Sequence, residues 1–324
     1  MNEISENGKD LDVSDRARRL ARVVARADIA ADYPLLKIVR IADPAFARLE
    51  AAVMVYVWHT LSRAYPDRVF TPGRDMLGTC AREIMSLPNR TPNGLLLPRR
   101  DTFQSFNMIH QALVGAVDAA DLLSCFSFLQ IPCNVRIVSG APDPQADARS
   151  YSSAKMHTDV WNGEPVSSIL FNIPVLGDPK AVDLRFYEPR EFPEELRTLL
   201  GDYSLGKAVT ASAVEYPAKF EMGYMYISDS LSLHQTMRVQ PTLRVSLDFR
   251  TIARELLPGE SADFSDSRAT YVEPDAWRAV GLTTILASSE PLDAFQRRRA
   301  GEVVVHEPLS IVNVDDFPSE RPNV

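Results

Sequence analysis

The chain has little cysteine. Its three thiols are Cys80, Cys125 and Cys133, in a total of 324 residues. An odd and sparse set without a Cys-x-x-Cys spacing argues against a disulfide framework and against a thiolate zinc site. Cys125 and Cys133 lie in apolar surroundings, which favours small residues of the core. A metal site built on cysteine is therefore not expected.

Long apolar runs are also missing. Residues 1–15 are polar and charged, and they lack the apolar segment of a signal peptide. The most apolar helical stretch, residues 45–61, contains Arg48 and Glu50 and is too short and too charged to cross a bilayer. These features predict a cytoplasmic protein that has no membrane partner.

The chain has no excess of positive charge. Its 35 Lys and Arg face 43 Asp and Glu, which gives a net charge of −8. An acidic chain is repelled by phosphate backbones, so nucleic acid is not expected as a partner. The short basic clusters at residues 16–19 and 297–299 are interpreted as solvated helix faces.

The hydrophobic pattern changes near Phe126, from a helical period to short β-type runs separated by turns. Helices are predicted at 14–28, 44–65, 76–85, 102–127 and 291–299, with a short helix or turn at 194–200. Strands are predicted at 128–138, 167–174, 182–187, 222–228 and 243–251, with edge strands at 303–305 and 310–314. Residues 66–101 are rich in Pro, Gly and Arg, which is typical of a long irregular segment that serves as a lid or entrance.

No clean linker divides the chain. We predict a disordered tail at residues 1–13 and a single domain at 14–324. Within that domain, residues 14–125 form a helical layer with a loop, 126–255 a β core, and 256–324 a C-terminal extension. The predicted fold class is α+β, with the helical layer packed on the β core.

The pair His157 and Asp159 is the first candidate for chemistry. In an extended segment, side chains two positions apart point to the same side, so both can face one metal ion while Thr158 turns away. A third ligand from a distant segment would complete a 2-His-1-carboxylate site, which leaves positions open and suits non-haem Fe(II). A closed structural zinc site would need a fourth protein ligand.

His234 is the best candidate for the third ligand. It follows a predicted strand and a turn. The chain has only five histidines. His59 and His110 lie on predicted helices, where we interpret them as structural, and His306 lies near the C-terminus.

The predicted strand at 243–251 is the most informative in the chain. Its alternation puts apolar side chains on one face and polar side chains on the other: Val245, Leu247 and Phe249 against Arg244, Ser246, Asp248 and Arg250. The planar fork of Arg244 and the hydroxyl of Ser246 suit the far carboxylate of a 2-oxo diacid whose other end chelates the metal. The alternatives are a strand facing water or an Arg–Asp ion pair, and these weigh more for Asp248 and Arg250.

These residues resemble the iron(II)/2-oxoglutarate-dependent oxygenases, and in particular members found in carbohydrate and antibiotic biosynthetic clusters. The likeness spans roughly residues 125–255 and is strongest at residues 157–165, at residues 171–175, and at His234 with Arg244-Val-Ser246. It implies a double-stranded β-helix, or jelly-roll, for the core. It also implies Fe(II), 2-oxoglutarate and O2 as cofactor and co-substrates, with succinate and CO2 as co-products.

Carried over residue by residue, the resemblance makes His157, Asp159 and His234 the iron ligands. It makes Arg244 the anchor of 2-oxoglutarate and Ser246 its helper. Halogenating members of the family lack the carboxylate ligand, so the presence of Asp159 argues against halogenation.

Several further residues are candidates for the same cavity. Asn134 and Arg136 point the same way on their predicted strand and are assigned to co-substrate binding. Asn172, Trp161 and Arg250 are candidates for the substrate. For Trp161, simple packing is an equal alternative.

The predicted function is the oxidation of an unactivated C–H bond in a small molecule of specialised, antibiotic-type metabolism. The outcome can be hydroxylation, desaturation or ring formation, and the substrate can be an amino acid, a sugar or a nucleoside-like molecule. The rival enzyme is a metal-dependent cupin, an isomerase or hydrolase, that uses no 2-oxoglutarate. The rival from another class is a catalytically silent jelly-roll binding protein. The sequence does not indicate the oligomeric state.

Overall fold

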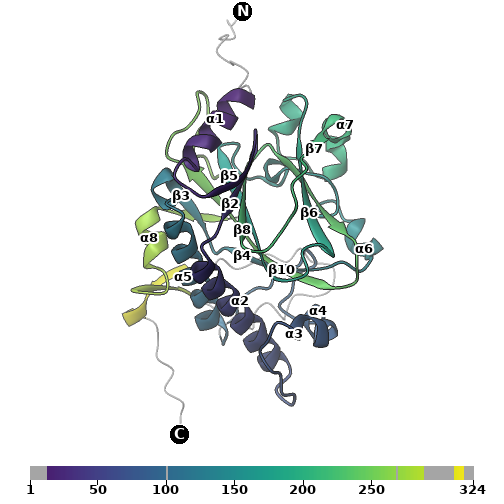
Figure 1. Ribbon diagram of the computed structural model, residues 1–324, viewed down its shortest axis with the longest axis vertical. Coiled ribbons are helices and arrows are strands. Elements are labelled where there is room, and N and C mark those ends of the chain that lie inside the picture. Colours follow the sequence, from purple (N-terminus) through teal and green to yellow (C-terminus); the bar gives the residue numbers. More distant parts are fainter. Residues whose placement is uncertain (1–12, 100, 268, 288–309, 317–324) are drawn as a thin grey trace, which may run out of the picture.

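The structure is a computed structural model, and it describes residues 13–99, 101–267, 269–287 and 310–316. It combines helices with antiparallel sheets (Figure 1). The α-helices are α1 (Val13–Val23), α2 (Asp43–Ala64), α3 (Met76–Thr79), α4 (Ala81–Met85), α5 (Phe103–Ala119), α6 (Pro144–Asp147), α7 (Lys207–Ser212) and α8 (Pro274–Ala279). Short 3₁₀ turns are η1 (Leu123–Cys125), η2 (Asp159–Asn162), η3 (Glu194–Leu196), η4 (Tyr203–Gly206) and η6 (Val314–Asp316).

The strands form three antiparallel sheets. Their bounds are β1 (Ile29–Tyr33), β2 (Leu36–Arg40), β3 (Phe126–Ile131), β4 (Asn134–Ser139), β5 (Ser168–Gly177), β6 (Val182–Glu188), β7 (Val214–Glu215), β8 (Tyr224–Asp229), β9 (Leu233–Arg238), β10 (Leu243–Ala253), β11 (Thr270–Val272), β12 (Thr284–Ala287) and β13 (Ser310–Asn313). The large sheet has the order β1-β2-β8-β5-β10-β3-β11, and β4 also pairs with β10. The small sheet has the order β7-β6-β9, and β12 pairs with β13.

Helices α2 and α5 lie against one face of the large sheet (Figure 1). The apolar side chains of β10, Val245, Leu247 and Phe249, are fully buried in the core that these helices share with the sheet. Burial of a side chain of this size contributes roughly 1.5–3 kcal/mol. The predicted packing of a helical layer on the apolar face of this strand is confirmed.

The other face of β10 points into a central cavity between the large and the small sheet. Residues of β5 and β10 line it from one side, and residues of β6 and β9 from the other. Loop residues close its remaining walls. The alternation along β10 thus divides the apolar core from the candidate site.

Several predicted boundaries are corrected by the structure. The first helix ends at Val23, because the residues after it enter β1 and pair with β2, two strands that the sequence analysis missed. The helix predicted to reach residue 127 ends at Ala119, where the chain turns through Asp121 at a φ of 55°. The strand predicted at 128–138 is two strands, because Pro132 has no N–H to continue the ladder. Strand β9 and helix α8 were also missed.

The interpretation of residues 16–19 as a solvated helix face is confirmed for Arg18, whose side chain is 61% exposed, and is wrong for the two arginines on either side of it. Arg16 and Arg19 of α1 are 0% and 2% exposed, and they meet Asp229 and Glu260 in one buried cluster, which we call the α1 cluster. Arg16 Nη1 lies 2.9 Å from Asp229 Oδ1, and its Nη2 lies 3.1 Å from Glu260 Oε1. Arg19 Nη2 lies 2.7 Å from Asp229 Oδ2, and its Nη1 donates to Glu260. The local sequence suggested that these arginines are exposed, because Asp229 and Glu260, which pair with them, lie far away along the chain.

Some expectations lie outside the described residues. They are the tail up to residue 12, the basic cluster 297–299, the helix at 291–299, the strand at 303–305 and His306. Among the described residues, no helix is long and apolar enough to cross a membrane. The three cysteines are free thiols. The cytoplasmic location and the division into one domain stay predictions.

Candidate metal centre

His157, Asp159 and His234 come together, with one candidate ligand atom from each lying within 4.8 Å of the others. The backbone brings the two histidines side by side, because His157 N donates to His234 O at 3.0 Å and His234 N donates back at 2.8 Å. Asp159 is not in extended backbone as the sequence suggested, since it begins η2. Thr158 caps this turn by accepting a hydrogen bond from Val160 N at 3.0 Å. Gly163 ends the turn at a φ of 92°, where a Cβ would come within 2.5 Å of Asp266 O.

Both imidazoles are prepared to bind a cation. His157 Nδ1 lies 2.7 Å from Lys155 O, so this nitrogen carries the proton and leaves Nε2 as a ligand atom. The ring of Tyr203 stacks on His157 at 4.2 Å and 11°. Burial, reinforced by the neighbouring His234, lowers the pKa of His157 to about 3, and burial also lowers the pKa of His234. Both rings are therefore neutral at physiological pH, as metal ligands must be.

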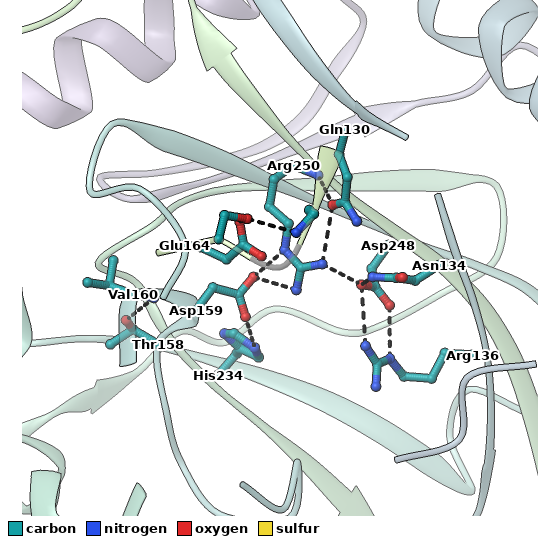
Figure 2. Close-up of polar contacts among 12 residues, drawn as sticks. Gln130, Asn134, Arg136, Thr158, Asp159, Val160, Glu164, His234, Asp248 and Arg250 are labelled. Carbon is teal, nitrogen blue, oxygen red and sulfur yellow. Dashed lines mark hydrogen bonds and ion pairs between the residues drawn. The ribbon is translucent and has the colours of Figure 1, made fainter. Parts of the chain in front are cut away.

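Asp159 is held in the charged form. Burial alone would raise its pKa, but Arg250 and the two imidazoles outweigh burial and lower the pKa to about 2. Arg250 Nε and Nη2 each lie 2.8 Å from Asp159 Oδ2. The other oxygen, Oδ1, faces His234 Nε2 at 3.7 Å (Figure 2). The carboxylate thus offers one oxygen to a cation while the guanidinium fixes the other.

All three guanidinium nitrogens of Arg250 contact described side chains, so they are engaged in the structure, and the predicted contact of Arg250 with a substrate stays a prediction. Its Nη1 also lies 3.2 Å from Asp248 Oδ1 and 3.3 Å from Gln130 Oε1 (Figure 2). The same Gln130 oxygen accepts from the Arg250 backbone N–H at 3.0 Å. Arg250 lines the cavity, but its guanidinium holds a candidate metal ligand.

Asn134 and Arg136 converge on Asp248. Asn134 Nδ2 donates to Asp248 Oδ1 at 2.7 Å, and Arg136 Nε donates to Asp248 Oδ2 at 2.9 Å. Arg136 lines the central cavity and also donates to Asn93 O at 2.9 Å, whereas Asn134 is not among the lining residues. The ion-pair alternative therefore describes Asp248 and its partners better than the predicted contact with a co-substrate.

Arg244 differs from the other charged residues of the cavity. It is 1% exposed, its Nη1 donates to Val182 O at 2.6 Å, and its guanidinium lies 4.8 Å from the centre of the Phe220 ring. No carboxylate among the described residues forms an ion pair with it, and its Nε has no partner there. Burial and the neighbouring Arg136 outweigh the attraction of Asp183 and Asp248 and lower the pKa of Arg244 to about 9, so Arg244 is a cation at neutral pH that forms no ion pair with a described carboxylate.

Ser246 and Asn172 line the same cavity as Arg244. Both are buried, and the Nδ2 of Asn172 has no hydrogen-bond partner among the described residues. Unpaired buried donors are rare in folded proteins and usually indicate a missing ligand or water. The structure thus gathers a cation, a hydroxyl and an amide donor in one cavity.

Trp161 does not line the central cavity. Its side chain is fully buried, and its Nε1 donates to Glu195 O at 2.8 Å. The indole lies against Gly206, where a Cβ would come within 2.0 Å of it. Of the two alternatives left open for Trp161, packing replaces contact with the substrate.

The sequence analysis missed eight residues of the cavity wall. Three lie on strands, and they are Leu170, Leu184 and Thr236. The other five come from loops or 3₁₀ turns, which have no periodic pattern to indicate the direction of a side chain, and they are Asn93, Tyr151, Ser153, Asn162 and Tyr203. The Pro- and Gly-rich segment 66–101 supplies one of them, Asn93, and its role as a lid or entrance stays a prediction.

Comparisons with known proteins give structural likenesses only. No protein-family model matches the chain, and no curated protein matches it. Among solved structures, the chain is similar to the non-haem monooxygenase ThoJ, with 15% identity, a TM-score of 0.36, and coverage of 81% of this chain and 84% of that one. It is also similar to AviO1 from Streptomyces viridochromogenes Tue57, with 15% identity, a TM-score of 0.34, and coverage of 76% and 98%.

A third similar structure is SnoK, a non-haem α-ketoglutarate-dependent carbocyclase from nogalamycin biosynthesis. It shares 8% identity, with a TM-score of 0.36 and coverage of 78% of this chain and 90% of that one. The likeness expected from the sequence thus reappears among solved structures. TM-scores of this size do not establish function, which has to be inferred from the geometry of the site.

Proposed function

We propose that this protein is a non-haem Fe(II)/2-oxoglutarate-dependent oxygenase that oxidises an unactivated C–H bond of a small molecule. The observation that carries the proposal is Arg244, a fully buried cation without an acidic partner among the described residues. It lines the same cavity as the His157–Asp159–His234 triad. Leaving a buried charge unpaired is expensive, so an anionic ligand is expected beside it.

The triad fits Fe(II). Two neutral imidazoles and one carboxylate are the donor set of the non-haem iron oxygenases, and three protein ligands leave coordination positions open. Bound iron would supply the O2 chemistry, which the protein side chains cannot perform themselves. Arg250 orients the carboxylate, and Lys155 O fixes the proton on His157 Nδ1, as outer partners commonly do for metal ligands.

The second half of the cavity fits 2-oxoglutarate. A guanidinium binds a carboxylate through two parallel hydrogen bonds, and Arg244 has unpartnered donor capacity. Ser246 adds a hydroxyl, and Asn172 adds an unpartnered amide. We assign these three residues to the co-substrate and the triad to the metal.

The overall reaction follows from these assignments. One O2 and one 2-oxoglutarate are consumed, one oxygen atom enters succinate, and CO2 is released. The other oxygen atom enters the product in hydroxylation or leaves as water in desaturation or ring formation. We also propose that the two facing sheets form the two sides of a jelly roll. Antibiotic-type metabolism is the proposed context.

Each rival function leaves one feature of the cavity unexplained. A metal-dependent isomerase or hydrolase that uses the triad alone has no need for a buried cation in the cavity. A silent binding protein has no need for neutral histidines that face a charged carboxylate. The proposed function accounts for the buried cation through 2-oxoglutarate and for the triad through Fe(II).

The test measures succinate. Protein reconstituted anaerobically with Fe(II) and then given 2-oxoglutarate and O2 is expected to release succinate, faster when a substrate is present. Arg244→Ala is expected to raise the Kd for 2-oxoglutarate at least 30-fold, about 2 kcal/mol, while iron still binds. Arg185→Ala is the matched control, because Arg185 lies on β6 outside the lining of the cavity. Unchanged affinity in Arg244→Ala would refute the co-substrate assignment, and iron binding without succinate would favour the rivals.

A further inference from the structure

One wall of the central cavity is formed by uncharged polar side chains from loops. Beyond the triad and the polar row of β10, five loop side chains line it: Asn93, Tyr151, Ser153, Asn162 and Tyr203. All five are uncharged, and all five carry groups that form hydrogen bonds. Neither the metal nor the co-substrate accounts for them.

Four of these side chains are free to bind a ligand. Within the described part of the chain, the side chains of Asn93, Ser153, Asn162 and Tyr203 form no hydrogen bond, whereas the Tyr151 hydroxyl donates to Leu200 O at 2.7 Å. Two amides and two hydroxyls offer donors and acceptors in similar number. A ligand whose groups both donate and accept, such as a hydroxyl, matches this set.

The charges of the cavity are already matched. Arg136 and Arg250 are paired with Asp248, and Arg250 also holds Asp159. Arg244 has no acidic partner among the described residues, and the proposed function assigns it to 2-oxoglutarate. No described charged side chain of the wall then remains to neutralise a charge on a substrate, and burying an unpaired charge is costly.

The wall is fixed to the metal site. Tyr203 stacks on His157, and its backbone N–H donates to Ser150 O at 3.0 Å. Lys155 Nζ lies 3.0 Å from Asp202 Oδ1, which ties η4 to the segment of the metal ligands. A group held by Tyr203 and Asn162 would therefore lie in the same cavity as the candidate metal ligands.

We infer that the part of the substrate bound in the cavity is an uncharged, hydroxyl-bearing group, such as a neutral sugar ring or another polyol. It would be bound by Asn93, Ser153, Asn162 and Tyr203. This inference rests on the proposed function, because it assumes that Arg244 is occupied by 2-oxoglutarate. It narrows the predicted classes of substrate by disfavouring amino acids, whose two charges would be unpaired here.

The test compares probes that share a scaffold and differ in charge. Methyl glucoside, methyl glucuronide, methyl glucosaminide and serine are added separately to protein loaded with Fe(II) and 2-oxoglutarate. The measured quantity is the rate of succinate release above the rate without a probe. The neutral glycoside is expected to stimulate release at a concentration at least 10-fold lower than any charged probe.

Two variants refine the test. Asn162→Asp adds one negative charge with little change in shape, and it is expected to weaken the effect of the neutral glycoside at least fivefold relative to that of the amino sugar. Tyr203→Phe removes the hydroxyl and keeps the ring on His157, so it should weaken the neutral probe without changing the Kd for 2-oxoglutarate. Asn313→Asp, on the distant strand β13, is the control.

Each outcome decides one point. A charged probe that acts at a lower concentration than the neutral glycoside overturns the inference, and so does the absence of any effect of the neutral probe while the protein binds 2-oxoglutarate. Equal responses of wild type and Asn162→Asp also overturn it. Failure of the protein to bind 2-oxoglutarate overturns the proposed function instead, so the two failures can be told apart.

Discussion

Two clusters of charged side chains in this protein have similar compositions and differ in how completely their ion pairs are formed. The α1 cluster contains two arginines and two acids, and so does the cavity cluster of Arg136, Arg250, Asp159 and Asp248. In the α1 cluster each acid meets both arginines, and every member is at most 2% exposed on its side chain. In the cavity cluster Asp159 keeps one oxygen directed at His234.

The difference separates a structural network from a candidate site. Buried charges are tolerated when they are paired, and in the α1 cluster each acid forms ion pairs with both arginines, although the Nε atoms of Arg16 and Arg19 have no hydrogen-bond partner among the described residues. The cavity cluster leaves a carboxylate oxygen uncommitted, and the neighbouring Arg244 has no acid among the described residues. Composition alone does not distinguish the two clusters, whereas a missing ion pair among the described residues does.

The largest expected effect follows from removing a candidate metal ligand in the cavity. His157→Ala or His234→Ala removes one of three candidate ligands, and the protein is expected to retain no iron after desalting. Metal content by elemental analysis, together with the Kd for Fe(II), checks this. His59→Ala is the control, because His59 lies on α2 and bonds to Ser105. Iron retention equal to wild type in both ligand variants would disprove the metal assignment.

The next effect concerns stability on the α1 side. Arg16→Leu leaves Asp229 and Glu260 with one arginine between them, and removal of one partner of a buried pair costs roughly 3–5 kcal/mol of unfolding free energy. Denaturant unfolding measures this loss, and the Kd for iron of the folded fraction should not change. The matched control is Arg18→Leu on the same helix, where a 61% exposed side chain should contribute under about 0.5 kcal/mol. Similar losses in the two variants would contradict the structural role of the cluster.

A smaller effect compares the two clusters directly. Arg250→Lys keeps the charge but loses the planar fork that holds Asp159. Loss of such an outer partner typically weakens metal affinity by roughly 10–100-fold. The Kd for Fe(II) checks this, with Arg19→Lys in the α1 cluster and the exposed Arg254→Lys as controls that should leave it unchanged. An unchanged Kd in Arg250→Lys would mean that the guanidinium does not orient the ligand.

The two clusters also show what local sequence can and cannot predict. The alternation along β10 was predictable because the period of a strand is a local property, and it placed Arg244 and Ser246 on one face and the core residues on the other. The burial of Arg16 was not predictable, since Asp229 and Glu260 lie more than 200 positions away in the chain. The alternation also places Arg250 on the same face of the strand as Arg244. The pairing of Arg250 with Asp159 was not predictable, because it depends on the fold.

The same limit explains the loop residues. Tyr203 lies in a 3₁₀ turn between β6 and β7, and its stacking on His157 depends on contacts such as Lys155–Asp202 that join distant segments. His234 was identified by its residue type and distance from Asp159, although the strand that carries it was missed. Candidate ligands can therefore be identified from the sequence where residue types are rare, while the residues of the cavity wall are identified only from the fold.

The smallest expected effect tests whether a single buried group without a charged partner avoids becoming charged. His110 of α5 is 0% exposed, its Nε2 lies 2.8 Å from Trp277 O, and no charged partner lies beside it within the described residues. Burial lowers its pKa from 6.5 to about 4. The unfolded chain therefore binds a proton at a higher pH than the folded chain, and the stability due to neutral His110 is complete above pH 6.5 and decreases as the pH falls towards 4.

Between pH 6.5 and 5.5 the loss is about 1 kcal/mol for this one group. The measurement compares urea unfolding of metal-free wild type and His110→Gln at the two pH values, since Gln keeps a donor for Trp277 O and does not titrate. The contributions of the remaining histidines cancel in the difference, so the stability gap should narrow by that amount at the lower pH. A constant gap would show that the folded protein accepts the proton, and that a buried charge here needs no partner, unlike Arg16 and Arg250.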